Sequence, residues 1–127
     1  MIEAIVRSYL SDKTSCGKNV FILKPEPKDF PTSTTKDYII VQNQATHMND
    51  LLWDSTVLIS CFSKDKDIRA AQIANAVLQL LLNWNTDDVT KVEIVNAPFP
   101  NHNSTTQEYR YQLQVKLYYY NKDIQIN

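Results

Sequence analysis

The strongest constraint in this 127-residue sequence is a β-type segment that leads directly into a long amphipathic helix. From Thr56 to Phe62 nearly every residue is apolar, β-branched or small, which is typical of a strand buried in a sheet. Ser63, Asp65 and Asp67 then supply the short oxygen-bearing side chains and the negative charge that favour a helix start. Apolar residues follow at three- and four-residue intervals, namely Ala70, Ile73, Ala74, Val77, Leu78, Leu81 and Trp84. A helix with such a stripe needs a sheet to cover.

The residues before this unit predict one helix and two strands. Apolar side chains at helical spacing indicate a helix from Ile2 to Lys13, and a short strand is expected from Val20 to Leu23. Residues 24–35 contain three prolines and a hydroxyl cluster, which favour an extended surface loop. A strand from Tyr38 to Gln44 follows, and it joins the buried strand in a long antiparallel hairpin with its tip near Asn49 and Asp50.

The residues after the long helix predict two more strands. One runs from Val89 to Val95 and is followed by a long, mostly polar connector. The last strand, Tyr109 to Tyr120, has the clearest alternation in the chain, with one face buried and one wet. The expected order is therefore α-β-β-β-α-β-β in a single domain covering residues 1–127. This order predicts an α+β fold, in which two helices pack on one face of an antiparallel sheet of about five strands.

Composition excludes several classes of protein. The formal net charge of −1, from 13 basic and 14 acidic residues, argues against a protein that mainly neutralises phosphates. The longest apolar run, Val77 to Leu82 interrupted by Gln79, is too short to cross a membrane. The first residues lack the pattern of a signal peptide, so we expect a cytoplasmic protein. With a single glycine, Gly17, the chain has no glycine-rich phosphate loop.

Histidines and cysteines do not predict a metal site. His47 and His102 lie in predicted loops, and neither stands at ligand spacing from a cysteine or a carboxylate cluster. Cys16 and Cys61 are too few and too unpatterned for a disulfide scaffold or a zinc site. Cys61 is expected to be a small hydrophobic residue of the core.

No catalytic or cofactor site is predicted either. The acidic pairs Asp65/Asp67 and Asp87/Asp88 offer acid and base groups, but carboxylates at helix ends are expected to cap helices and to face water. No serine sits in a glycine-flanked nucleophile turn. The residues therefore indicate a binding or assembly protein with no cofactor, rather than an enzyme.

Taken over its full length, the chain resembles the tail terminator, or tail completion, proteins of bacteriophages with long non-contractile tails. The resemblance is carried by the opening helix from Ile2, by the segment Asp37 to Val41 after a proline-containing connector, and by the alternating strand Thr56 to Phe62. The helix from Asp67 to Val77 and the closing strand from Tyr109 to Tyr119 complete it. The sequence departs from similar proteins after the first helix, where Gly17 is the sole glycine of the turn.

The resemblance implies an assembly role without catalysis. Subunits would form a ring, typically hexameric, that docks on the last ring of the tail tube, stops its polymerisation and offers a surface for head attachment. The implied partners are further copies of the chain, the major tail tube protein and the head-completion or connector protein. DNA would pass through the ring without specific binding, and no membrane is involved. The implied location is the tail-neck junction of the virion, reached from the host cytoplasm during assembly.

A cyclic ring brings two different patches of each subunit together, so two non-identical surfaces are needed. We expect contacts with neighbouring subunits or with the tail tube from the hairpin around Met48 to Trp53, the loop from Pro98 to Thr106 and the outer face of the last strand. The candidate residues are Met48, Leu51, Leu52, Trp53, Phe99, His102, Arg110, Gln112, Tyr118 and Tyr120. Trp53 has two interpretations, because large aromatic residues serve both to cap a core and to anchor a subunit contact.

Two alternative functions remain open from the sequence. The first is another neck or head-completion protein that binds the connector rather than the tail tube. The second is a ferredoxin-like module that binds a small ligand, since two helices on an antiparallel sheet serve many functions.

Overall fold

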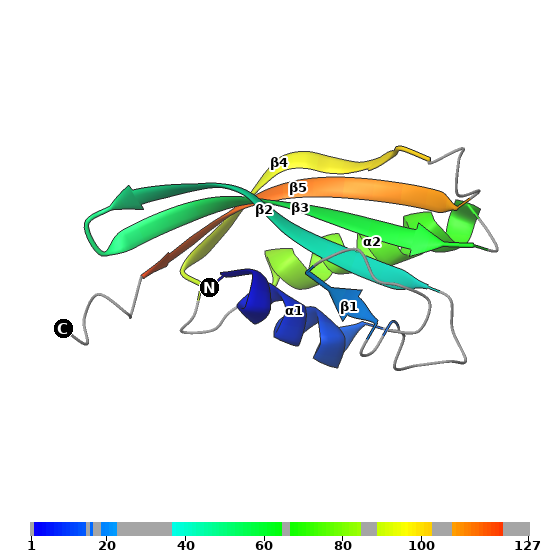
Figure 1. Ribbon diagram of the computed structural model, residues 1–127, viewed down its shortest axis with the longest axis horizontal. Coiled ribbons are helices and arrows are strands. Elements are labelled where there is room, and N and C mark those ends of the chain that lie inside the picture. The colour runs from blue at the N-terminus through cyan, green and yellow to red at the C-terminus, as the bar shows by residue number, and fades with distance from the viewer. Residues whose placement is uncertain are drawn as a thin grey trace.

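The computed structural model describes residues 2–14, 16, 19–22, 37–64, 67–84, 89–102 and 108–120. Its elements follow the predicted order α-β-β-β-α-β-β and form an α+β fold (Figure 1). Their bounds are α1 (Ile2–Lys13), β1 (Val20–Phe21), β2 (Tyr38–Asn49), β3 (Leu52–Ser63), α2 (Asp67–Leu82), β4 (Lys91–Pro100) and β5 (Tyr109–Tyr120). Helix α2 begins at Asp67, whereas Ser63 is the last residue of β3 and does not cap the helix.

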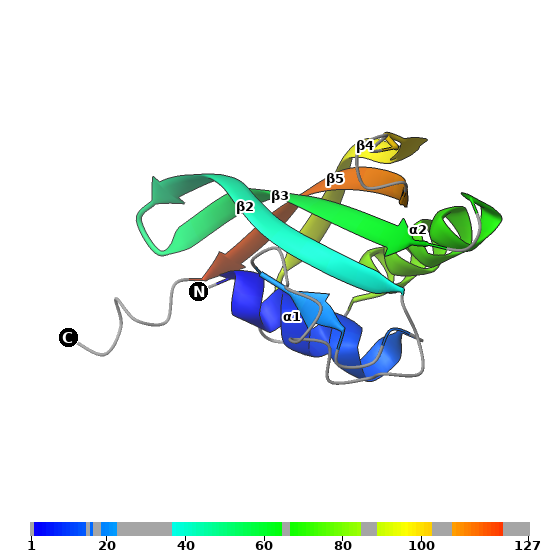
Figure 2. The same cartoon turned by 45° about the vertical axis from the view of Figure 1, so that its right-hand side comes forward.

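The five strands form one twisted sheet in the order β1-β2-β3-β5-β4 (Figure 2). β5 therefore lies between β3 and β4, although it comes last in sequence among the strands of the described residues. The pairs β2–β3, β3–β5 and β5–β4 are antiparallel, as predicted. β1, in contrast, runs parallel to β2 through the pairs Val20↔Ile39 and Phe21↔Ile40. The sheet is thus mixed. Parallel pairing is possible because Phe21 and Tyr38 are far enough apart in sequence for the chain to return in the same direction.

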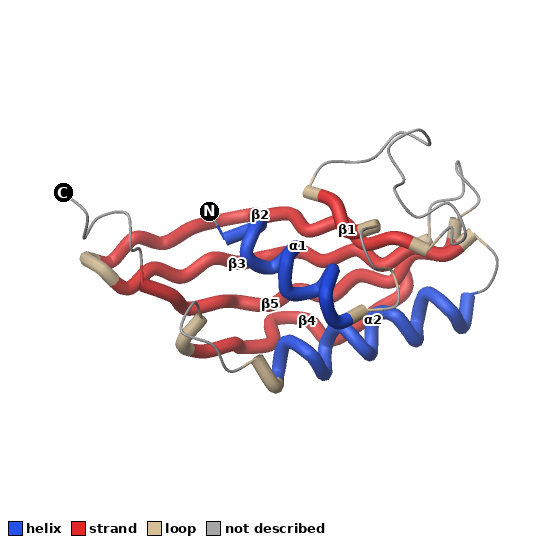
Figure 3. Tube along the Cα trace, turned by 90° about the horizontal axis from the view of Figure 1, so that it is seen from below, coloured by secondary structure: helices blue, strands red, loops and turns tan. Residues whose placement is uncertain are grey.

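Both helices cover the same face of the sheet, as the view in Figure 3 shows. The helices bury the predicted stripes, with Ile2, Val6 and Leu10 on α1 and with Ala70, Ile73, Ala74, Val77 and Leu81 on α2. Alternate residues of the sheet meet them, including Val57, Ile59, Cys61, Leu113, Val115 and Leu117. Because side chains alternate across a strand, the other residues of the same strands form the opposite face, on which neither helix of the described residues lies.

The two helices are also joined to each other near the end of α2. The rings of Tyr9 and Trp84 are stacked with centroids 4.3 Å apart, and the Tyr9 hydroxyl donates to the Leu80 carbonyl oxygen at 2.7 Å. Aromatic stacking and a satisfied hydroxyl together favour one relative position of the helices. Trp84 therefore belongs to the helix layer, as its place in the apolar stripe predicted.

The β2–β3 hairpin is longer than the sequence indicated. Its strands pair from Tyr38↔Phe62 to Asn49↔Leu52, and Asp50 and Leu51 form the turn at the predicted tip. Asp50 has a φ of 54°, in the left-handed region that Asp tolerates better than most residues. The distal half of the hairpin extends beyond the helices in Figure 1. Residues 45–49 were missed as strand because they are mostly polar, and pairing with β3 holds them extended.

Strand β4 also differs from its prediction, because it continues to Pro100 instead of ending at Val95. Residues 98–100, expected in a loop, belong to the strand, and Phe99 pairs with Gln112 of β5. Register shifts between Ile94 and Asn96 and between Asn96 and Phe99 interrupt the alternation that normally reveals a strand. The predicted features at Gly17, Asp65, Asp87, Asp88, residues 24–35, 103–106 and 121–127 lie outside the described residues.

Candidate interaction surfaces

The predicted hairpin residues form an exposed apolar group at one end of the sheet. The side chain of Met48 is 69% exposed, and Leu51 and Leu52 are also exposed. Tyr120 joins them, because it is the pairing partner of Leu52 at the end of β5 and is itself exposed. Clusters of large exposed apolar side chains are typical of interaction sites.

Trp53 is half-buried and is tied to the hairpin itself. Its indole N–H donates to the backbone carbonyl oxygen of Asp50 at 3.0 Å, so the ring fastens the turn at the tip. It is the second residue of β3, next to the turn, and does not belong to the buried core that the helices cover. The ring is therefore positioned at the edge of the exposed apolar group.

Four of the other five predicted residues lie at the opposite end of the sheet, where His102 links three elements, and the fifth, Tyr118, lies near Tyr120 on β5. Its Nδ1 accepts from the backbone N–H of Arg110 at 3.0 Å, and its Nε2 lies 3.0 Å from Oδ1 of Asp67, the first residue of α2. The edges of the Tyr109 and Tyr111 rings complete its surroundings. His102 thus joins the end of β4 to β5 and α2.

Arg110 and Gln112 are also held by contacts within the chain. Arg110 Nε donates to the Asn101 carbonyl oxygen at 2.6 Å, and its guanidinium lies 5.9 Å from the centre of the Phe62 ring. Gln112 is only 8% exposed, although its position on the outer face of the strand predicted a wet side chain. Phe99, its pairing partner, remains exposed.

The ten predicted residues therefore form two groups rather than one site. Arg110 and Tyr118 are eight positions apart on β5, which corresponds to about 26 Å at roughly 3.3 Å per residue. The hairpin group and Tyr120 lie at one end of this strand, and the group around His102 lies at the other. A partner molecule can therefore contact the residues at one end of β5 without touching those at the other end.

A network of side-chain amides on the helix-free face was not predicted. Asn101 Nδ2 donates to Gln112 Oε1 at 2.7 Å, and Gln112 Nε2 donates to Ser60 Oγ at 3.0 Å. A second series runs from Asn96 Nδ2 to Gln114 Oε1 at 2.7 Å and from Gln114 Nε2 to Gln44 Oε1. The alternation of polar residues on β5 was visible in the sequence. Their connection was not, because it depends on the strand order.

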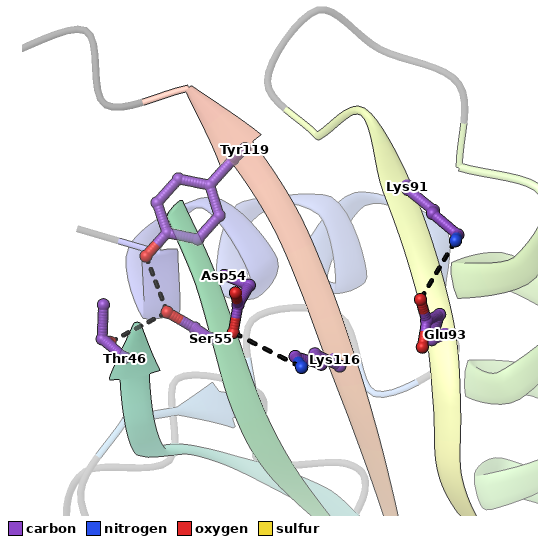
Figure 4. Close-up of polar contacts among 7 residues, drawn as sticks. All are labelled: Thr46, Asp54, Ser55, Lys91, Glu93, Lys116 and Tyr119. Atoms are coloured by element: carbon purple, nitrogen blue, oxygen red, sulfur yellow. Dashed lines mark hydrogen bonds and ion pairs between the residues drawn. The ribbon is translucent and has the colours of Figure 1, made fainter. Parts of the chain in front are cut away.

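Charged residues on the same face pair with one another (Figure 4). Lys116 Nζ lies 3.7 Å from Asp54 Oδ1, and Lys91 Nζ lies 3.0 Å from Glu93 Oε1. Asp54 raises the pKa of Lys116, and the hydrogen bond from Lys91 lowers the pKa of Glu93, so each pairing favours the charged form of these two groups. Both ammonium groups also lie 5.5 Å from the centre of the Tyr118 ring. This part of the surface is charged but locally neutral.

A hydroxyl cluster holds the base of the hairpin on the face that carries the helices. Ser55 Oγ lies 2.6 Å from the Tyr119 hydroxyl and 2.9 Å from Thr46 Oγ1 (Figure 4). The three residues come from β3, β5 and β2, so the cluster connects all three strands. Ser55 is fully buried, and its partners meet the hydrogen-bonding requirement of a buried hydroxyl.

The thiols are placed as core residues. Cys61 is fully buried, which confirms the prediction, and Cys16 is buried in the same cluster. Burial raises the pKa of the Cys16 thiol to about 12 and that of Cys61 well above its usual value. Both groups are therefore protonated near neutral pH and are poor nucleophiles.

Two further results concern the described part of the chain only. Its His, Cys, Asp and Glu side chains do not gather into a group of three or more that could hold a metal ion. None of its helices is long and apolar enough to cross a membrane.

Comparison with known proteins identifies a solved structure that has a similar fold. No family model matches the chain, and no curated protein sequence matches it. Among solved structures, the chain is similar to one from a structure described as the virion of a native gene transfer agent particle. The TM-score is 0.71 at 13% sequence identity, and the match covers 94% of this chain and 95% of that chain. The two chains therefore share a fold over nearly their whole lengths.

The order of elements separates this fold from one alternative raised by the sequence. Ferredoxin-like domains follow the order β-α-β-β-α-β. The present chain starts with a helix and places three strands before α2. The likeness to ferredoxin-like domains is limited to a sheet with two helices on one face.

Proposed function

We propose that this protein is a tail terminator of a bacteriophage with a long non-contractile tail. Copies of the chain form a ring, of six subunits as the resemblance implies, at the head-proximal end of the tail tube. The ring stops polymerisation of the tube and provides the surface for head attachment. The observation that carries the proposal is the shared fold, over 94% of the chain, with a component of a virion particle.

The distribution of exposed apolar residues supports a ring. One group lies on the hairpin and a second lies along the outermost strand β4, and the members are Met48, Leu51, Leu52, Ile94, Val95 and Phe99. These groups differ in sequence and lie on different strands. A cyclic ring joins two unlike patches of neighbouring subunits, and this chain offers such a pair.

The helix-free face supports a conduit for DNA. Its ion pairs Asp54–Lys116 and Lys91–Glu93 balance in charge, and its amide groups bond to one another. Binding of the phosphate backbone depends on unpaired basic groups. A surface of neutral amides and paired charges allows DNA to slide without being retained.

Deletion of the gene in the phage that encodes the chain, followed by electron microscopy of lysates, tests the proposal. Loss of a terminator leaves tube growth unchecked, so we expect tails longer than wild type and not joined to heads. Expression of the chain from a plasmid is the control and restores normal tails.

Two other results would assign the chain differently. Tails of normal length that fail to join heads would indicate a head-completion protein that acts on the connector. Intact virions of normal infectivity would remove the chain from virion assembly altogether.

A further inference from the structure

Among the strands of the described residues, two edges of the sheet are open, one on each side. β1 pairs only with Ile39 and Ile40, so within the described ranges no strand lies against residues 42–49 on that side of β2. On the other side, β4 is the outermost strand, and residues 91–94 pair regularly with β5 before the first register shift. An open edge presents backbone N–H and C=O groups that can bind another strand.

The two open edges stand at the same level of the sheet. Ala45 of β2 and Glu93 of β4 share one row, because their partners on β3 and β5 pair with each other. His47 and Lys91 share another row in the same way. A second copy placed beside the first at the same height would therefore bring one edge next to the other.

The directions of the strands also agree. At this level the sheet consists of β2, β3, β5 and β4, and each is antiparallel to its neighbour. An even number of alternating strands leaves β2 and β4 pointing in opposite directions. Rotation of a copy about an axis along the strands preserves these directions, so β4 of one copy meets β2 of the next in antiparallel orientation.

We propose that residues 91–94 of one copy pair with residues 42–47 of the next copy, so that the sheet continues from subunit to subunit around a closed ring. The inference rests on the proposed function only in requiring that copies form a ring. Closure removes the open edges, as it does in a β-barrel. The occupant of each edge is therefore a second copy of this chain.

Charge favours this contact. Residues 42–49 contain no Asp, Glu, Lys or Arg, and on the other edge Lys91 and Glu93 neutralise each other at 3.0 Å. Joining the edges therefore places no unpaired charge in the seam. Exposed apolar residues at the same end of the sheet, such as Ile94, add buried area when the copies approach.

Irregularities in the two edge strands favour closure. β2 has a register shift between Asn43 and Ala45, and β4 has one between Ile94 and Asn96, in neighbouring rows of the sheet. Bulges increase local twist and bend a strand, which a sheet needs in order to curve into a ring. Farther along β4, Pro98 and Pro100 lack backbone N–H groups, so pairing is confined to the first half of the strand.

Disulfide trapping tests the proposed register. The variant Ala45→Cys/Glu93→Cys places one thiol on each edge, in the same row and on the same face. Directly opposite residues of antiparallel strands have Cα atoms about 4.5–5.5 Å apart, within the range of a disulfide, whereas a shifted register does not bring them so close. The pair His47→Cys/Lys91→Cys tests the next row independently. The native thiols are buried and do not compete.

The purified variants are oxidised mildly across a concentration series, while light scattering measures the mass of the species before oxidation. The matched control is Ala45→Cys/Gln72→Cys, whose second thiol lies on the exposed side of α2. We expect both edge pairs to give a ladder of covalent oligomers that ends at a closed species, and the control and single-cysteine variants to give no such ladder.

Two results would overturn the inference. Oligomers detected by light scattering without linkage in either edge pair would mean that another surface joins the copies. A monomer at every concentration, without linkage, would mean that the edges do not associate. Neither result bears on tail length in the deletion phage, so the proposed function is judged separately.

Discussion

Two leucine substitutions should affect different properties of the protein. Leu113→Ala should mainly lower the stability of the subunit, whereas Leu52→Ala should mainly reduce assembly. Leu113 is fully buried on β5, beside Ile59 of β3 and beneath the helices. Leu52 is 40% exposed at the hairpin tip. The same side-chain truncation therefore creates a cavity in one case and mainly changes a surface in the other.

The expected magnitudes follow from these positions. Leu113→Ala removes buried carbon atoms and leaves a cavity. We therefore expect it to lower the free energy of unfolding by about 3–5 kcal/mol. This is a large part of the roughly 5–15 kcal/mol that stabilises a typical domain. At Leu52 we expect about 1 kcal/mol or less. With an m value of about 2 kcal/mol per molar urea, Leu113→Ala lowers the midpoint by about 1.5–2.5 M and Leu52→Ala by about 0.5 M or less.

Urea unfolding followed by circular dichroism measures both midpoints, at a protein concentration where light scattering shows a monomer. Working with the monomer matters because association adds to apparent stability. Equal shifts for the two variants would refute the reasoning, because the hairpin tip would then pack against the body of the subunit. If the hairpin contacts a partner, Leu52→Ala reduces ring formation without unfolding the chain.

Four further substitutions test individual side chains. Tyr119→Phe removes the 2.6 Å hydrogen bond to Ser55 and should lower the free energy of unfolding by about 1 kcal/mol in urea titrations. Burial raises the pKa of the Cys16 thiol from 9.0 to about 12, so the unfolded chain loses this proton at a lower pH than the folded chain. The free energy of unfolding should therefore fall as pH rises from 9 to about 12. Cys16→Ala should make this decline less steep when unfolding is measured across that pH range. Trp84→Ala should cost about 3–5 kcal/mol, whereas Trp53→Ala should cost far less, as measured by thermal unfolding.

Each of these predictions has a result that would contradict it. An unchanged urea midpoint in Tyr119→Phe would mean that water replaces the Ser55 contact at no cost. An alkaline decline of the same slope in Cys16→Ala would assign it to other groups. Equal losses for Trp84→Ala and Trp53→Ala would place Trp53 in a packed core.

The sequence predicted those parts of the fold in which burial follows a regular period. The stripes of α1 and α2 repeat at helical spacing, and β5 alternates over its whole length, so their bounds were predicted closely. Residues 45–49 and 96–100 were not recognised as strand. In the first segment the side chains are mostly polar, and in the second the register shifts break the alternation.

The surfaces were predicted less completely than the core. The exposed tip with Met48 and Leu52 follows from apolar residues beside a turn, which is a local signal. The buried position of Gln112 depends on contacts with Ser60 and Asn101, which lie on other elements. The parallel pairing of β1 has the same origin, because strand order is decided by the packing of the whole chain.

The place of β5 between β3 and β4 has a consequence for biosynthesis. Leu52 and Tyr120 pair although they are 68 residues apart, and Ser63 and Tyr109 pair although they are 46 apart. A nascent chain can close the local β2–β3 hairpin early, but β3 and β4 have no common neighbour until the last strand has been made. Contacts of this sequence separation slow folding. The centre of the sheet therefore forms only after β5 has been synthesised, and truncated chains that lack β5 are left with two unpaired strand edges inside the domain.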